Sequence, residues 1–136
     1  MDMKPILLMS LMFFSLPLFA QVPAASDSAK YVFKCKLTER VPLPAGCGVI
    51  AWALVQKFEV LQTDCPGYSN KYVLIIQPCP EFLGKDFFKK NDVYKIIAAT
   101  TSGAPFGYTI VNQFKNEQLP IFWSRKTEKK MNRFIQ

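Results

Sequence analysis

Apolar and polar residues alternate with a period of two along residues 31–37. The apolar positions are Tyr31, Phe33, Cys35 and Leu37. Lysines stand between them at positions 34 and 36, and Val32 is the one break in the pattern. This alternation predicts a strand with one buried face and one face in water.

The longest apolar stretch after the N-terminal region is residues 49–62, rich in β-branched and aromatic residues. Fourteen residues are long for a strand, so we expect a bend or bulge near Gln56–Lys57. A turn centred on Pro66–Gly67 follows, and the next strand, 71–77, is apolar on both faces and therefore expected to be central. The two strands should form an antiparallel hairpin.

The rest of the chain predicts shorter elements separated by Pro- and Gly-containing loops such as 41–48 and 100–105. Residues 81–90 predict one or two helical turns that bury Phe82, Leu83, Phe87 and Phe88. Further strands are expected at 93–99, 106–114 and 121–123. The count is five or six short strands with one short helical insert, which is typical of an all-β fold, here a small OB-like barrel.

Three segments also resemble a netrin-type module. They are Cys47–Gly48, the long strand from Trp52 to Leu61, and the run Phe88 to Ile96. This OB-fold family includes the tissue inhibitors of metalloproteinases, and the resemblance covers roughly residues 33–123. Those inhibitors bind the protease zinc through an N-terminal cysteine. The first cysteine here is Cys35, so no inhibitory residue is carried over.

The N-terminus predicts export. Lys4 precedes an uncharged apolar run from Ile6 to Ala20, which has the pattern of a signal peptide over residues 1–20. Cleavage is expected after Ala20, with Ala24 or Ala25 as the alternative. The run is shorter than the roughly 20 residues that span a bilayer. Residues 21–29 would form a flexible leader and 30–136 a single domain, secreted or periplasmic.

Four cysteines lie in that domain, at positions 35, 47, 65 and 79. An even number in an exported chain predicts two disulfides. Their spacing lacks the close C-x₂₋₄-C pairs of structural zinc sites. Because the hairpin brings its outer ends together, we predict Cys47–Cys79, with Cys35–Cys65 as the second bridge.

The sequence contains no histidine, no phosphate-binding glycine motif and no C-x-x-C pair. Histidine-assisted nucleophilic catalysis and thiol redox chemistry are therefore not indicated. Among the carboxylates, Glu81 and Asp86 lie beside aromatic residues, but five positions apart they do not share a helical face. We expect a protein that is not an enzyme and needs no cofactor.

The chain carries a net charge of +7. Basic residues gather in 123–136, which predict a basic tail or a short amphipathic helix, and at Lys85, Lys89 and Lys90. An OB-like barrel can bind anions across a basic face with stacking aromatics, for which the aromatic candidates also include Tyr68, Tyr72 and Phe106. The candidate binding residues are Arg125, Lys126, Lys129, Lys130, Trp123, Lys89, Lys90 and Tyr108. The competing interpretation is a solvated basic surface that keeps the protein soluble.

Two functions follow from these observations. The first is a non-catalytic binding module for a protein or an anionic envelope component; because the chain is expected to be exported, nucleic acid is not expected as a partner. The second is an inhibitor of a secreted hydrolase such as a protease, inserting loop 41–48 or 100–106 as a wedge. Prolines in 41–44 would preorder that loop and lower the entropy cost of binding.

Overall fold

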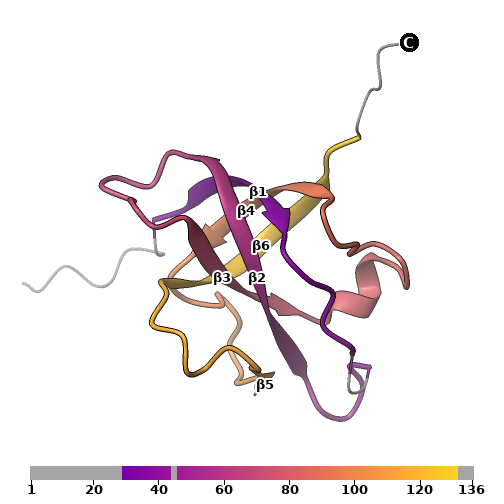
Figure 1. Ribbon diagram of the computed structural model, residues 1–136. Coiled ribbons are helices and arrows are strands. Elements are labelled where there is room, and N and C mark those ends of the chain that lie inside the picture. Colours follow the sequence, from indigo (N-terminus) through magenta and orange to yellow (C-terminus); the bar gives the residue numbers. More distant parts are fainter. Residues whose placement is uncertain (1–28, 44–45, 132–136) are drawn as a thin grey trace, which may run out of the picture.

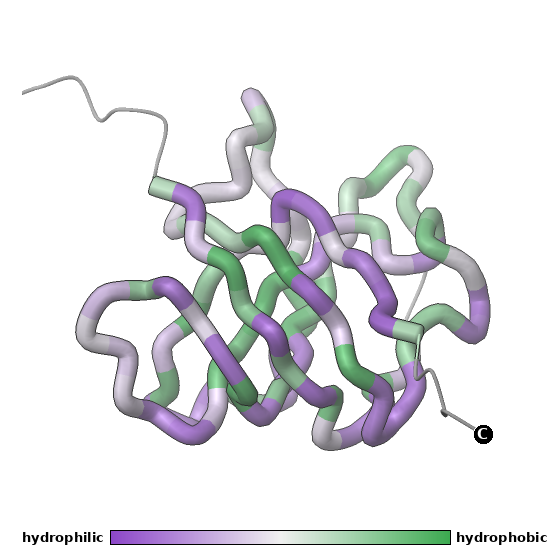
Figure 2. Tube along the Cα trace, turned by 90° about the horizontal axis from the view of Figure 1, so that it is seen from above, coloured by the Kyte–Doolittle hydropathy of each residue, from purple (hydrophilic) through white to green (hydrophobic). Residues whose placement is uncertain are grey.

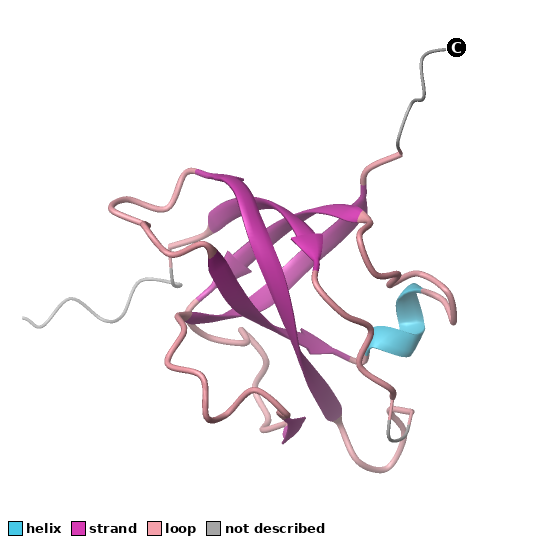
Figure 3. Cartoon of the chain, in the orientation of Figure 1, coloured by secondary structure: helices cyan, strands magenta, loops and turns pink. Residues whose placement is uncertain are grey.

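A computed structural model describes residues 29–43 and 46–131. The described residues form six strands and a single turn of 3₁₀ helix (Figures 1 and 3). They are β1 (Tyr31–Leu37), β2 (Trp52–Thr63), β3 (Tyr72–Pro78), η1 (Pro80–Leu83), β4 (Val93–Ala99), β5 (Thr109–Val111) and β6 (Ile121–Lys129). The predicted signal peptide and nearly all of the leader lie outside the described residues.

Five of the strands close into a mixed barrel. β1 pairs antiparallel with both β2 and β4, β2 with β3, and β4 with β6, and the parallel pair β3–β6 completes the ring. The short β5 adds to the outside of β2. The predicted all-β, OB-like barrel with a short helical insert between the third and fourth strands is confirmed.

Strand β2 pairs with two different strands along its length, which explains why it is twelve residues long. Its N-terminal part pairs with β3 and its C-terminal part with β1. The register moves from Lys34 opposite Gln62 to Cys35 opposite Val60, so Leu61 is the extra residue of a β-bulge. The bulge predicted near Gln56–Lys57 therefore lies further along β2, in the part of the strand that pairs with β1.

Three predicted elements differ from the structure. The helical insert is a four-residue 3₁₀ turn, and Phe82 and Leu83 lie on the surface while Phe88 is buried. The strand expected at 106–114 shortens to β5, because this segment packs outside the barrel. The final strand extends through Lys129, so residues 123–129 are neither tail nor helix, and residues 132–136 lie outside the described part.

Two hydrophobic clusters hold the fold together. Alternate side chains of the strands, including Phe33, Phe58 and Tyr94, fill the barrel. A second cluster lies on the outer side of β3, where Leu74 and Ile76 are covered by Phe114 and Trp123. β3 is therefore buried on both faces, as predicted. Figure 2 shows hydrophobic and hydrophilic positions alternating along the strands.

A buried polar network lies inside the barrel. The Thr127 hydroxyl donates to Oε1 of Gln77 at 2.8 Å, and Ser124 and Thr127 share a hydrogen bond at 2.8 Å. These inward polar residues of β6 are satisfied by one another and by β3. The network explains how a strand rich in polar residues is accommodated in the barrel wall.

Candidate functional site

An open groove of about 460 Å³ lies on the outside of the barrel, where β1, β4 and the ends of β2 and β6 meet. Its lining includes Val32, Gln62 and Thr63 and three lysines from separate segments, Lys34, Lys95 and Lys130. Because Phe33 and Cys35 point into the barrel, Lys34 must point outward. The same alternation places Lys95 outward between the buried Tyr94 and Ile96.

Lys34 and Lys95 are direct partners in the β1–β4 ladder. Side chains in such facing positions have Cβ atoms about 4.5–5.5 Å apart, and like charges there are destabilising. Within the described residues neither lysine forms an ion pair, and neither does Lys130. The groove therefore concentrates positive charge that the protein does not neutralise by direct pairing.

Two carboxylates lie near these lysines, and both have other partners. Oδ1 of Asp64, on the groove wall, accepts the Val32 N–H at 2.7 Å and so closes the β1–β2 end. Glu128, facing Lys95 from β6, pairs with Lys126 at 2.8 Å. The hydrogen bond and charge of Lys126 lower the pKa of Glu128, and Lys95 and Lys130 lower it further. Four lysines thus face two carboxylates on this surface.

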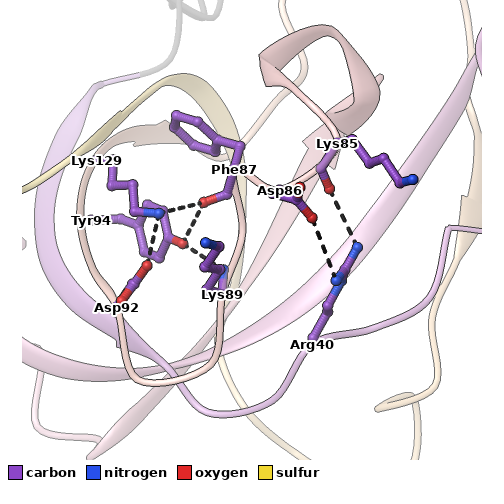
Figure 4. A network of polar contacts seen from close by, with 8 residues as sticks. All are labelled: Arg40, Lys85, Asp86, Phe87, Lys89, Asp92, Tyr94 and Lys129. Carbon is purple, nitrogen blue, oxygen red and sulfur yellow. Dashed lines mark hydrogen bonds and ion pairs between the residues drawn. The ribbon is translucent and has the colours of Figure 1, made fainter.

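The predicted binding residues do not form one patch. Lys126 and Lys130 belong to the lysine surface just described. Lys129 points away from that surface, pairing with Asp92 at 2.8 Å and donating to the Phe87 carbonyl at 3.3 Å. Figure 4 shows it beside Tyr94 in a network that holds the loop before β4. Lys89 and Lys90 are exposed on that loop.

On another side of the barrel, Trp123 and Tyr108 pack in the second hydrophobic cluster, with ring centres 5.5 Å apart. Arg125 donates from Nε to the Thr101 carbonyl at 3.0 Å and so fastens the loop after β4. These three residues secure the connection from β4 to β6. They are not neighbours of Lys130 in the groove.

The aromatic candidates divide between two parts of the described barrel. The β2–β3 surface, through which OB folds bind ligands, is partly covered by the segment that carries β5. Tyr68 packs edge-on against the core residue Phe33, with ring centres 5.4 Å apart. The Lys57 ammonium nitrogen lies over the Tyr72 ring, 4.6 Å from the ring centre. Tyr68 and Tyr72 therefore serve other parts of the fold than Phe106, Tyr108 and Trp123, which stack in a row with neighbouring ring centres 5.1 and 5.5 Å apart.

The predicted bridge Cys47–Cys79 is present, with Cα atoms 5.5 Å apart. It joins the loop before β2 to the start of η1, and a carboxylate oxygen of Glu81 accepts the Cys47 N–H. The two sulfur atoms and Glu81 are close enough to suggest three metal ligands. Because both sulfur atoms are bonded to each other in the disulfide, they are not free to bind a metal, and the cluster has a structural role.

The predicted bridge Cys35–Cys65 is wrong, since both residues are free thiols. Cys35 is opposite Val60, while Cys65 follows the end of β2, five residues further along the chain. At roughly 3.3 Å per strand residue, the two are too far apart for a disulfide, which needs Cα atoms about 4.4–6.8 Å apart. Burial raises the pKa of the Cys35 thiol to about 12, so it stays protonated at neutral pH.

Glu81 and Asp86, the carboxylates singled out from the sequence, serve different structural contacts. Glu81 holds the disulfide loop, and Asp86 forms an exposed ion pair with Arg40 at 4.0 Å. They do not act on a common cleft. Within the described residues, therefore, the pair does not provide the two converging carboxylates of a hydrolase.

Lys34 and Lys95 were not among the sequence candidates. In the sequence each is one polar residue of an alternating strand, which is the ordinary pattern of a solvated face. They meet only through the β1–β4 pairing, which joins segments about sixty residues apart. The sequence offered one signal for this pair. Lysines stand at the polar positions 34 and 36 of the first predicted strand, and another lysine stands inside the later predicted strand 93–99.

Comparison of the chain with family models, with curated proteins and with solved structures finds no match. The resemblance to netrin-type modules therefore stays a prediction. In the part of the chain that the structure describes, no helix has the length and apolar character needed to span a bilayer.

Proposed function

We propose that the protein is an exported, non-catalytic binding module whose ligand carries phosphate or sulfate groups. The binding site is the groove formed by Lys34, Lys95 and Lys130. The observation that carries the proposal is the facing pair Lys34 and Lys95, two lysines side by side on adjacent strands, neither of which forms an ion pair among the described residues. An anion bound between them would stabilise both charges.

The shape of the groove favours a ligand with more than one anionic group. The lysines come from β1, from β4 and from the residue after β6, so they are spread over the groove. Val32 and Thr63 also line the groove and offer an apolar and a hydroxyl contact. Long lysine side chains bind phosphate as flexible point charges, which suits a repeating polyanion better than a single oriented group.

Direct binding tests the proposal. The full chain would be titrated with inorganic polyphosphate, with a sulfated glycan, and with vesicles of phosphatidylglycerol in phosphatidylcholine. Binding to at least one probe should weaken steeply as salt increases, because the contacts are between exposed charges. Preference among the three probes distinguishes a free phosphate polymer, a sulfated polymer and a lipid surface as the source of the anion. Absence of binding to all three at low salt would refute the proposal.

One observation favours the second candidate function, an inhibitor of a secreted hydrolase. The loop before β2 is fastened by the disulfide at Cys47 and exposes Leu43, Val49 and Ile50. Exposed apolar side chains beside a disulfide suit insertion into a protease cleft. Screening against serine and metalloproteases at micromolar concentration tests it, and an inhibitor should lose potency when Val49 and Ile50 are replaced by serine.

A further inference from the structure

Exposed apolar side chains gather at the disulfide end of the barrel. Ten large apolar residues of the described chain are exposed, and five of them lie in the segments beside the bridge Cys47–Cys79. These five residues are called the apolar tip: Leu43, Val49, Ile50, Phe82 and Leu83. Val49 is fully exposed, and Phe82 is 75% exposed. Single exposed apolar residues are ordinary, whereas a group of them marks an interaction surface.

The two main segments of the apolar tip are held side by side. The disulfide places the Cα atoms of Cys47 and Cys79 5.5 Å apart, and the Cys47 N–H donates to a carboxylate oxygen of Glu81 in η1. Val49 and Ile50 follow closely after Cys47, and η1 begins directly after Cys79. Figure 3 shows the loop before β2 and η1 on the same side of the barrel. Because a covalent bond fixes this arrangement, presenting the tip to a partner costs little ordering.

The apolar tip presents no charge of its own. Residues 46–51 contain no ionisable side chain other than the bridged Cys47. Glu81 is the one acidic residue of η1, and its carboxylate is directed into the protein. One of its oxygens accepts the Cys47 N–H, and the other is buried. The tip could therefore enter a bilayer interface without carrying an ionised group into the hydrocarbon, which would be costly.

Basic residues border the apolar tip. Arg40 and Lys85 line a narrow slot together with Leu43 of the tip, and Lys89 is exposed further along the loop that carries Lys85. Lys85 and Lys89 form no ion pair among the described residues. Asp86 pairs with Arg40 at 4.0 Å (Figure 4). Three cations thus accompany one carboxylate. Positive charge beside exposed apolar side chains is complementary to an anionic lipid surface, where headgroups attract the cations and the layer beneath accepts the apolar groups.

These features favour a lipid surface over a protein cleft or a second copy of the chain. A cleft that accepts an inserted loop would cover the loop before β2, whereas the apolar tip also includes Phe82 and Leu83 of η1. Two copies that met through their tips would bring the same basic residues together, since a two-fold interface uses the same surface twice. Like charges across such an interface are unfavourable.

We infer that the apolar tip is a membrane-docking site, which inserts into the interface of a bilayer that contains anionic lipid. Val49 and Phe82 enter the bilayer, and Arg40 and Lys85 contact the headgroups. This site is separate from the lysine groove, because the two share no residue. They also lie toward opposite ends of β2, since the loop with Val49 precedes the strand and Thr63, on the groove wall, ends it.

Tryptophan placed in the apolar tip tests the insertion. The full chains Val49→Trp and Phe82→Trp are mixed with vesicles of phosphatidylglycerol in phosphatidylcholine, prepared with and without phosphatidylcholine brominated in its acyl chains. Bromine quenches tryptophan only at close range, so both variants should show a blue-shifted emission and quenching above that of the original chain, in which Trp52 and Trp123 set the background. Phe106→Trp, at an exposed aromatic position outside the tip, is the matched control and should add no quenching.

Serine variants measure the apolar contribution by co-sedimentation with the same vesicles. Val49→Ser combined with Phe82→Ser should weaken binding by about tenfold or more, because two apolar side chains no longer leave water. Phe106→Ser combined with Ile121→Ser, at exposed positions outside the tip, should leave binding unchanged. Thermal melts check that each variant is folded.

The lysine groove and the apolar tip give different results in these experiments. Binding through the groove alone would hold the protein on the vesicles without quenching at position 49 or 82, which would overturn the docking site and leave the proposed function standing. Quenching at both tip positions supports the docking site whichever polyanion the groove prefers. Absence of quenching at either tip position, or equal quenching at position 106, would overturn the inference.

Discussion

Lys34 of β1 and Lys95 of β4 face each other across an antiparallel ladder on the outside of the barrel. Opposite charges are the stabilising combination at such positions, and two lysines repel. On the same surface, Glu128 is engaged by Lys126 at 2.8 Å, so the nearest acidic side chain in the ladder already has a partner. This arrangement costs stability and leaves positive charge without direct pairing, which is the trade-off expected of the binding site proposed above.

The first prediction concerns stability. Replacing Lys34 by glutamine should raise the free energy of unfolding by roughly 0.2–1 kcal/mol, because it removes the repulsion with Lys95. The gain should shrink at 1 M salt, where charges are screened within about 3 Å. Urea denaturation at low and high salt measures both. The control is Lys115→Gln, at an exposed position outside the groove, which should change little; a loss of stability in Lys34→Gln would contradict the account.

The second prediction concerns the disulfide. Alkylation of the denatured, unreduced protein should label two thiols, Cys35 and Cys65, and leave Cys47 and Cys79 linked. Replacing Cys47 and Cys79 together by alanine should lower stability by about 2–4 kcal/mol, because the unfolded chain gains freedom. Peptide mapping and urea denaturation measure these effects. Detection of a Cys35–Cys65 peptide would contradict the observed arrangement of β1 and β2.

The third prediction concerns alkaline pH. Burial raises the pKa of Cys35 from 9.0 to about 12 in the folded protein. The unfolded chain therefore loses this proton first as pH rises. The contribution of Cys35 to stability is complete below pH 9 and is lost progressively between pH 9 and about 12.

A valine in place of Cys35 should flatten this dependence, since valine does not titrate. Lysine and tyrosine ionisation affects both proteins alike, so the comparison isolates the thiol. Urea midpoints at pH 8 and pH 10.5 for the original chain and Cys35→Val provide the measurement. The same fall in stability in both proteins would show that the thiol is not shielded.

The fourth prediction concerns the loop between η1 and β4. The Tyr94 hydroxyl donates to the Phe87 carbonyl and accepts the Lys89 N–H, both at 2.8 Å (Figure 4). Tyr94→Phe should cost about 1–3 kcal/mol, because it leaves the Lys89 donor without its acceptor. Hydrogen exchange at Lys89 should accelerate with it. Tyr31→Phe, at a hydroxyl with no hydrogen bond among the described residues, should leave both quantities unchanged.

Much of the fold could be predicted because its strands have clear local patterns. The alternation over residues 31–37 and the apolar run 71–77 correspond closely to β1 and β3. The Cys47–Cys79 bridge followed from the hairpin, since the ends of paired strands must meet. Strand β6 was underestimated because its inward positions include Ser124 and Thr127, whose hydroxyls bond to each other and, through Thr127, to the distant Gln77.

The candidate site was harder to predict, because it depends on pairing between distant segments. Lys126 and Lys130 were expected from the density of basic residues near the C-terminus. Lys34 and Lys95 were not, since only the register of β1 against β4 brings them together. Lys129 shows the converse, because it is adjacent to Lys130 in sequence but points to Asp92 on the other side of the strand.

The most direct test of the account compares two charge-matched triple variants in binding to the polyanion that the full chain prefers. One replaces Lys34, Lys95 and Lys130 by glutamine, and the other replaces Lys71, Lys90 and Lys115, which lie outside the groove. Both lower the net charge equally, so non-specific attraction falls by the same amount. The groove variant should lose at least tenfold in affinity, about 1.4 kcal/mol, while the control retains most of it. Equal losses in the two variants would contradict a site at the groove.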